Sequence, residues 1–151
     1  MEIKENCTAH LGDFIRLNEE WISYYFQIED VDRKLAKNPK KIIDNGGYIF
    51  SIVIDCKVIG VCALFDKGNG FFELARMAVS EKYRGNGYDE KLIKICIQKL
   101  KDIKAKEVYL ISNTKLKLAI TLYEKHGFKV SEICRHAAYS RANITMVQKI
   151  S

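Results

Sequence analysis

The stretch most informative about the fold is residues 77–89, which read MAVSEKYRGNGYD and connect an expected strand to an expected helix. Gly85 and Gly87 let successive backbone N–H groups converge on an anion. The helix that starts at Gly87 adds the partial positive charge of its N-terminus, and Arg84 can hold a phosphate through two hydrogen bonds. On these residues alone, an anion-binding loop and an ordinary surface turn are equally well supported.

Two common nucleotide-binding motifs do not fit this loop. The chain has no G-x-x-x-x-G-K-[ST] sequence, which a phosphate-binding P-loop requires. A dinucleotide-binding fingerprint needs a third glycine where Glu90 stands, and it needs a strand that runs directly into the loop. Residues 80–84 intervene here, so the sequence favours neither motif.

The hydrophobic pattern on both sides of the loop predicts an alternation of helices and strands. We expect helices in pieces over residues 11–45, then at 87–103 and 116–126, and strands at 48–54, 58–65, 71–79, 107–112, 128–134 and 142–149. The first three strands form an antiparallel meander. This order predicts an α+β fold with a mixed, mostly antiparallel sheet flanked by helices. Without a linker or repeat, residues 1–151 are expected to form a single domain.

The charge balance of the chain invites an anionic partner. Lys and Arg number 25 against 19 Asp and Glu, a net charge of +6. The lysines are spread out and no nucleic-acid motif is present, so we expect no nucleic-acid partner. The longest apolar run, residues 58–65, is too short to cross a membrane, and the charged N-terminus is not a signal peptide, so we expect a cytoplasmic protein. The Cys and His spacings match no metal site, so no metal is expected.

Two blocks of the sequence resemble one family. The stretch from Met77 to Tyr88 resembles the acetyl-CoA signature R/Q-x-x-G-x-G/A of the GNAT superfamily of N-acetyltransferases. A second block, AITLYEKHGF at residues 119–128, is similar to the family's A-I-x-L-Y-E-K-x-G-F block. The order of elements is also similar along essentially the whole chain. The resemblance implies a GNAT-like fold and an acyltransferase that moves an acetyl group from acetyl-CoA directly to a primary amine in a ternary complex.

The resemblance also implies the residues that bind the cofactor. They are Met77, Ala78, Val79, Arg84, Gly85, Asn86, Gly87, Tyr88, Asp89 and Asn113. The side chain of Asn113 either bonds to the pantetheine or the acceptor, or caps the next helix. Asp89 stands where the signature has Gly or Ala; its carboxylate suits a helix N-terminus but repels a pyrophosphate. Either it points away from the cofactor or it weakens binding, which keeps a non-catalytic acyl-CoA-binding module or regulator as the alternative.

Glu73 and Tyr123 are the expected catalytic residues. An alkyl amine with a pKa of about 10.4 is protonated at pH 7, so the reaction needs a base. Glu73 stands where many family members carry a catalytic glutamate; the alternative is a structural ion pair, for example with Arg76 or a C-terminal arginine. By alternation it shares one strand face with Phe71, Ala75, Met77 and Val79. Tyr123 matches the family's proton donor to the departing thiolate; the alternative is a tyrosine packed in a helix.

The acceptor site is expected between the first helices and the last strands. Tyr25, Arg141 and Asn143 are the predicted substrate residues, with Trp21, Tyr24, Phe26 and Tyr139 as further candidates. Aromatic residues at this density are more often part of a core than of a substrate wall, and Arg141 fits a surface charge as well as a clamp for an acceptor carboxylate. The expected acceptor is an amine-bearing small molecule or peptide. Paired subunits are common in the family, so a homodimer is one expected state.

Overall fold

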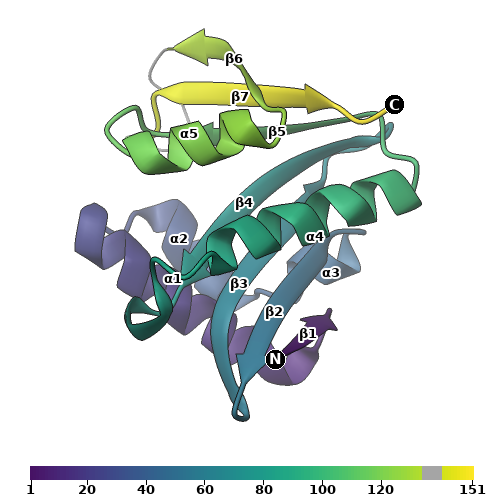
Figure 1. Cartoon of the computed structure of the whole chain (residues 1–151). Helices are drawn as coiled ribbons and strands as arrows, with labels where there is room; N and C mark the ends of the chain where they lie inside the picture. Colours follow the sequence, from purple (N-terminus) through teal and green to yellow (C-terminus); the bar gives the residue numbers. More distant parts are fainter. Residues whose placement is uncertain (134–140) are drawn as a thin grey trace.

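The computed structural model describes residues 1–133 and 141–151. Seven strands form one sheet in the order β1-β2-β3-β4-β5-β7-β6 (Figure 1). The strands are β1 (Glu2–Glu5), β2 (Tyr48–Ile54), β3 (Lys57–Asp66), β4 (Phe71–Val79), β5 (Glu107–Ser112), β6 (Lys129–Ile133) and β7 (Ile144–Lys149). The helices are α1 (Leu11–Tyr25), α2 (Asp30–Lys37), α3 (Lys41–Asp44), α4 (Tyr88–Asp102) and α5 (Lys117–Lys125), with short 3-10 turns at Thr8–His10 and Glu81–Tyr83.

This architecture confirms the predicted α+β fold and the antiparallel meander of β2, β3 and β4. The expected elements are present, and the largest shift of a described boundary is at β7, which starts at Ile144 rather than at 142. Strand β1 was not predicted, because all of its residues are exposed and it shows no alternation of buried and exposed positions. Within residues 1–133 and 141–151, no helix combines the length and the apolar character needed to cross a membrane.

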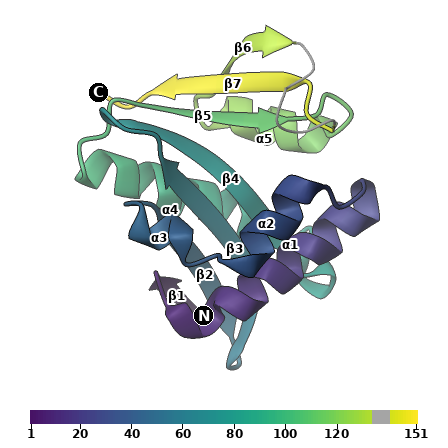
Figure 2. The same cartoon turned by 180° about the vertical axis from the view of Figure 1, so that it is seen from behind.

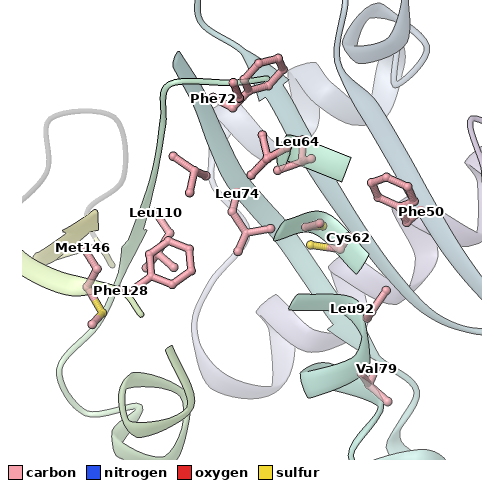
Figure 3. Packing of buried hydrophobic residues seen from close by; sticks show 14 of the residues in the cluster. Phe50, Cys62, Leu64, Phe72, Leu74, Val79, Leu92, Leu110, Phe128 and Met146 are labelled. Carbon is pink, nitrogen blue, oxygen red and sulfur yellow. The ribbon is translucent and has the colours of Figure 1, made fainter. Parts of the chain in front are cut away.

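Helices cover both faces of the sheet. Helices α4 and α5 lie on one face and α1, α2 and α3 on the other, as the two opposite views show (Figures 1 and 2). On the α4 face, apolar residues of α4 such as Leu92 pack against Cys62 of β3 and Leu74 of β4 (Figure 3). The same layer continues to Leu110 and Phe128, so β5 and the segment after α5 share one core with the meander.

Strands β4 and β5 separate after a short parallel contact. Their pairing covers Phe71–Glu73 opposite Glu107–Tyr109, and within residues 1–133 and 141–151 the rest of β4 has no strand partner on that side. Each strand directs alternate N–H and C=O groups to both sides, so this unpaired edge exposes backbone hydrogen-bonding groups. The separation therefore creates the edge on which the candidate site is built.

A β-bulge interrupts β4 in this separated part. Cys62 of β3 stands opposite two residues of β4, Arg76 and Met77, and the backbone of Arg76 has a φ of +60°. The extra residue reverses the alternation of faces. Met77 and Val79 therefore join the α4-side core, whereas Ala78 joins the α1-side core. The prediction that Glu73 shares a face with Met77 and Val79 is wrong, because strand alternation does not anticipate a bulge.

Candidate functional site

A cavity of about 590 Å³ lies between the separated parts of β4 and β5. Its lining comes from α1, from β4 over residues 73–79, from the loop at the start of α4, from the end of β5 and from α5. Segments from across the chain thus meet at the gap in the sheet. Ligand pockets of enzymes commonly fall in this size range. Most of the predicted cofactor-binding residues line this cavity; the exceptions are Asn86 and Gly87.

The glycine loop presents unpartnered backbone donors. Among the described residues, the N–H groups of residues 85–89 have no hydrogen-bond partner. Gly85 and Gly87 have φ angles of +78° and +82°, a conformation that glycine adopts without a steric penalty. Gly87 is also the N-cap of α4, so the donors are concentrated at the positive end of a helix. The loop therefore has the arrangement expected of an anion-binding site.

Asp89 lies within this donor array. It is one of the residues lining the cavity, and its Oδ1 accepts a hydrogen bond from the N–H of Glu90 at 2.8 Å. The carboxylate thus takes up a helix N-terminal donor that an anionic ligand could otherwise use. It also brings a negative charge to the end of the cavity where the other donors are free.

Arg84 is tied to the protein at the base of the loop. Its Nε donates to the carbonyl oxygen of Val79 at 2.9 Å, and its guanidinium lies 5.5 Å from the ring centroid of Tyr24 on α1. Through these two contacts, the side chain of Arg84 connects the loop to β4 and to α1. Its predicted contact with a phosphate stays a prediction.

The start of α4 is also linked to the end of α5. Glu90 accepts a hydrogen bond from Nζ of Lys125 at 3.0 Å, and Nε2 of His126 lies 3.5 Å from the same carboxylate oxygen. The hydrogen bond from Lys125 lowers the pKa of Glu90, and the approach of His126 lowers it further. Lys125 and His126 come two and three residues after Tyr123, so their contact with Glu90 links the start of α4 to the segment that carries Tyr123.

Tyr123 places a phenol in the cavity. Its ring packs edge-on against Phe128, with centroids 6.0 Å apart, and its hydroxyl has no hydrogen-bond partner among the residues that the structure describes. Burial raises the pKa of this phenol well above its usual value, and the nearby Cys62 and Asp89 raise it further. The hydroxyl is therefore protonated at neutral pH and can donate a hydrogen bond to a ligand.

Glu73 is buried at the junction where β4 and β5 begin to separate. Only 6% of the residue is exposed, and it lines the cavity. Its Oε1 accepts from the hydroxyl of Tyr109 at 3.3 Å and lies 3.5 Å from Nζ of Lys67. Among the described residues, the cation paired with Glu73 is Lys67, whose side chain is 46% exposed, and neither Arg76 nor Arg141 takes that place. Arg135, the other C-terminal arginine, lies outside the described residues. The carboxylate thus connects the cavity to a solvent-accessible ammonium.

A buried charge cluster beside the cavity was missed by the sequence analysis. Asp32 of α2 accepts hydrogen bonds from Arg76 at 2.6 Å and from both Nη atoms of Arg141 at 2.8 Å. Arg141 also donates to Glu29 at 3.0 Å. Burial raises the pKa of Asp32, but hydrogen bonds from Arg141, the Glu29 N–H and Arg76 outweigh it and hold the pKa at about 2.

The aromatic residues of α1 form a wall of the cavity. Tyr25 and Phe26 line it together with Trp21, whose ring centroid lies 5.2 Å from that of Tyr25 and 6.0 Å from that of Phe26. Trp21 also packs against the α1-side core. Tyr24 is 67% exposed and lies outside the lining. Tyr25 therefore lies in the wall of the cavity and is not part of the buried core.

Of the remaining residues predicted to bind the acceptor, Arg141 lines the cavity and Asn143 does not. Arg141 lines the cavity, but its guanidinium binds Asp32 and Glu29, so it is neither a surface charge nor an open clamp. Asn143 is not part of the lining; its side chain bonds to the N–H and the hydroxyl of Thr114. Tyr139 lies outside the described residues.

Asn113 lines the cavity at the end of β5, and its side chain is engaged by the protein. Its Nδ2 donates to the carbonyl of Arg141 at 2.7 Å and its Oδ1 accepts from the N–H of Lys115 at 2.9 Å. The N-cap of α5 is Leu116, so of the two alternatives for Asn113 the helix cap is not observed. Within the part of the chain that the structure describes, no group of His, Cys, Asp or Glu is arranged to hold a metal ion.

Comparisons with known proteins agree with this geometry. The family model for the GNAT acetyltransferase domain matches residues 45–130, and no curated protein matches the sequence. Among solved structures, an acetyltransferase of the GNAT family from Staphylococcus aureus Mu50 is similar over 99% of both chains, at 18% identity and a TM-score of 0.86. The PaiA N-acetyltransferase from Thermoplasma acidophilum, in complex with coenzyme A, is similar over 99% of both chains (18% identity, TM-score 0.75). The ribosomal-protein-S18-alanine N-acetyltransferase from Escherichia coli is similar over 99% of this chain and 94% of its own (20% identity, TM-score 0.79).

Proposed function

The chain belongs to the GNAT acetyltransferase domain family, and from this premise we propose that it transfers an acetyl group from acetyl-CoA to the primary amine of an acceptor by direct attack in a ternary complex. The observation that carries the proposal is the cavity, which extends from the donor loop at Gly85, Tyr88 and Asp89 to the phenol of Tyr123 and the carboxylate of Glu73. A donor array, an acid and a base thus border one space.

The loop fits the anionic part of acetyl-CoA. The free N–H groups of residues 85–89 and the N-terminus of α4 suit a pyrophosphate. The unpaired edge of β4 from residue 74 to 79 offers backbone groups to the pantetheine, in the way that a strand edge binds an extended chain. When bound, acetyl-CoA supplies the activated acetyl group. The complex of the Thermoplasma relative with coenzyme A supports this assignment.

The residues around the cavity suggest a division of roles. Glu73 removes a proton from the acceptor amine, directly or through a water, and releases that proton to solvent water after the product leaves. Tyr123 donates a hydrogen bond to the sulfur that leaves with CoA. The aromatic wall around Tyr25 receives the body of the acceptor, a small molecule or peptide bearing a primary amine.

The proposal is tested by following thiol release from acetyl-CoA with the purified chain and a panel of amines, alongside calorimetric titration with CoA. We expect CoA to bind and at least one amine to accelerate thiol release over the rate without amine. Binding of CoA without acceleration by any amine would favour the non-catalytic binding module. Absence of CoA binding would contradict both functions.

Replacing Asp89 by Ala is expected to tighten CoA binding. The change removes a negative charge from the donor loop and frees the N–H of Glu90, so we expect the Kd for CoA to fall by about tenfold, or about 1.4 kcal/mol. Calorimetry at low and high salt measures the effect, which should shrink as salt screens the charge. Asp102→Asn, at the opposite end of α4, is the matched control and should leave the Kd unchanged. A Kd that stays the same or rises in Asp89→Ala would show that the carboxylate does not oppose the pyrophosphate.

A further inference from the structure

The buried charge cluster of Asp32, Arg76, Arg141 and Glu29 has no role in the proposed chemistry. The side chains of Asp32 and Arg76 are 2% and 6% exposed, and their ion pair joins α2 to the middle of β4. Removing charges from water is costly, so a buried ion pair is weak evidence for added stability. The position of the Asp32–Arg76 ion pair instead indicates which part of the structure it holds in place.

The element held by this ion pair is the β4 bulge. Arg76 has a φ of +60°, a conformation that a residue with a side chain adopts only where its surroundings hold it. The surroundings are specific here, because the guanidinium of Arg76 reaches Asp32 at 2.6 Å. Arg76 and its neighbours Ala75 and Met77 are among the residues that line the cavity, in the part of β4 that does not pair with β5.

We propose that Asp32 is a positioning residue, whose ion pair with Arg76 holds the β4 bulge in the conformation that presents the backbone of Arg76 and Met77 to the acyl group. This inference rests on the proposed acyl transfer. Backbone donors accelerate such reactions only when they are already oriented toward the oxygen that gains charge. The same carboxylate also binds Arg141, which lies three residues before the start of β7. The side chain of Asp32 therefore connects α2 both to β4 and to the segment that leads into β7.

A pair of variants on the same helix tests this role. Asp32→Asn keeps the shape of the side chain and removes its charge, whereas Asp30→Asn removes the charge of a residue whose side chain is 91% exposed and contacts only Arg33 among the described residues. We expect kcat to fall by about tenfold or more in Asp32→Asn, with the Kd for CoA unchanged and the folded protein retained, and no change in Asp30→Asn. Equal kcat values for the two variants would overturn the inference.

Variants of Arg76 separate positioning from general stability. Arg76→Lys keeps a cation for Asp32 and should retain more of the kcat than Arg76→Gln does. Arg76→Gly adopts the positive φ without strain, so adding Asp32→Asn to Arg76→Gly should lower kcat by less than about twofold. If the losses of Asp32→Asn and Arg76→Gly multiply instead, Asp32 does not act through Arg76 and the inference fails.

Amide hydrogen exchange supplies a readout that does not depend on activity. We expect Asp32→Asn to speed exchange over residues 75–79 of β4 while exchange over the loop at residues 84–89 stays as in the unaltered protein. Asp30→Asn should change neither region. If no amine serves as acceptor, the proposed function fails but this measurement still decides whether Asp32 holds the bulge. Unchanged exchange over residues 75–79 in Asp32→Asn would overturn it.

Discussion

Replacing Glu73 by Gln is expected to lower kcat/KM for the amine by about 10²-fold or more at pH 7, the usual size of a general-base effect. The glutamine keeps the shape of the side chain and can still accept from Tyr109, but it cannot take a proton. Initial rates of thiol release with an accepted amine measure the loss. Glu107→Gln, on the neighbouring strand and outside the cavity lining, is the matched control and should change the rate by less than about twofold.

The pH dependence of this loss distinguishes a base from a structural ion pair. As the pH rises toward the amine pKa of about 10.4, more of the acceptor is already neutral and needs no base. The gap between the unaltered protein and Glu73→Gln should therefore narrow steadily from pH 7 to about pH 9.5. Lys67→Met, which breaks the ion pair and keeps the carboxylate, should lose less than Glu73→Gln does. Equal losses in the two variants, or a gap that does not depend on pH, would contradict the base role.

The sequence predicted the framework of the site because its signals are local. The loop at residues 84–88 is recognisable from its glycines, which have positive φ angles in the structure. The second block contains Tyr123, which lies on a helix that borders the same cavity. Strand limits such as Tyr48–Ile54 follow from runs of β-branched and aromatic residues between turn residues. These patterns depend on neighbours in the sequence, so a single sequence is enough to find them.

The bulge and the charge cluster were not predicted, because their causes are not local. A positive φ is usually signalled by glycine, but here it falls on Arg76, which gives no such signal. The partners of Asp32 come from the middle of the chain and from near its end, and each of them alone looks like a surface charge. One partial signal was available: an acidic residue at position 29 followed by Asp32 is typical of a helix start, and the carboxylate of Asp32 does accept from the N–H of Glu29.

Replacing Tyr123 by Phe is expected to lower kcat by about 10²-fold, because the sulfur that leaves would lose the hydrogen bond that stabilises its developing charge. Full proton transfer from an ordinary phenol to a thiolate of pKa about 8.5 is already uphill by roughly 2 kcal/mol. Burial raises the pKa of Tyr123 further, so the phenol stabilises the developing charge by a hydrogen bond and keeps its proton.

This assignment makes a specific kinetic prediction for Tyr123→Phe. Because the hydroxyl acts on charge that appears only during the reaction, kcat should fall while KM for acetyl-CoA and the Kd for CoA stay close to their original values. The edge-on contact with Phe128 is available to a phenylalanine ring too, so the thermal unfolding temperature should change little. Tyr48→Phe, a tyrosine of β2 outside the cavity lining, is the matched control. A rise in KM with an unchanged kcat would instead make Tyr123 a residue that only binds the cofactor, and the acid at the sulfur would have to be sought among the other residues lining the cavity.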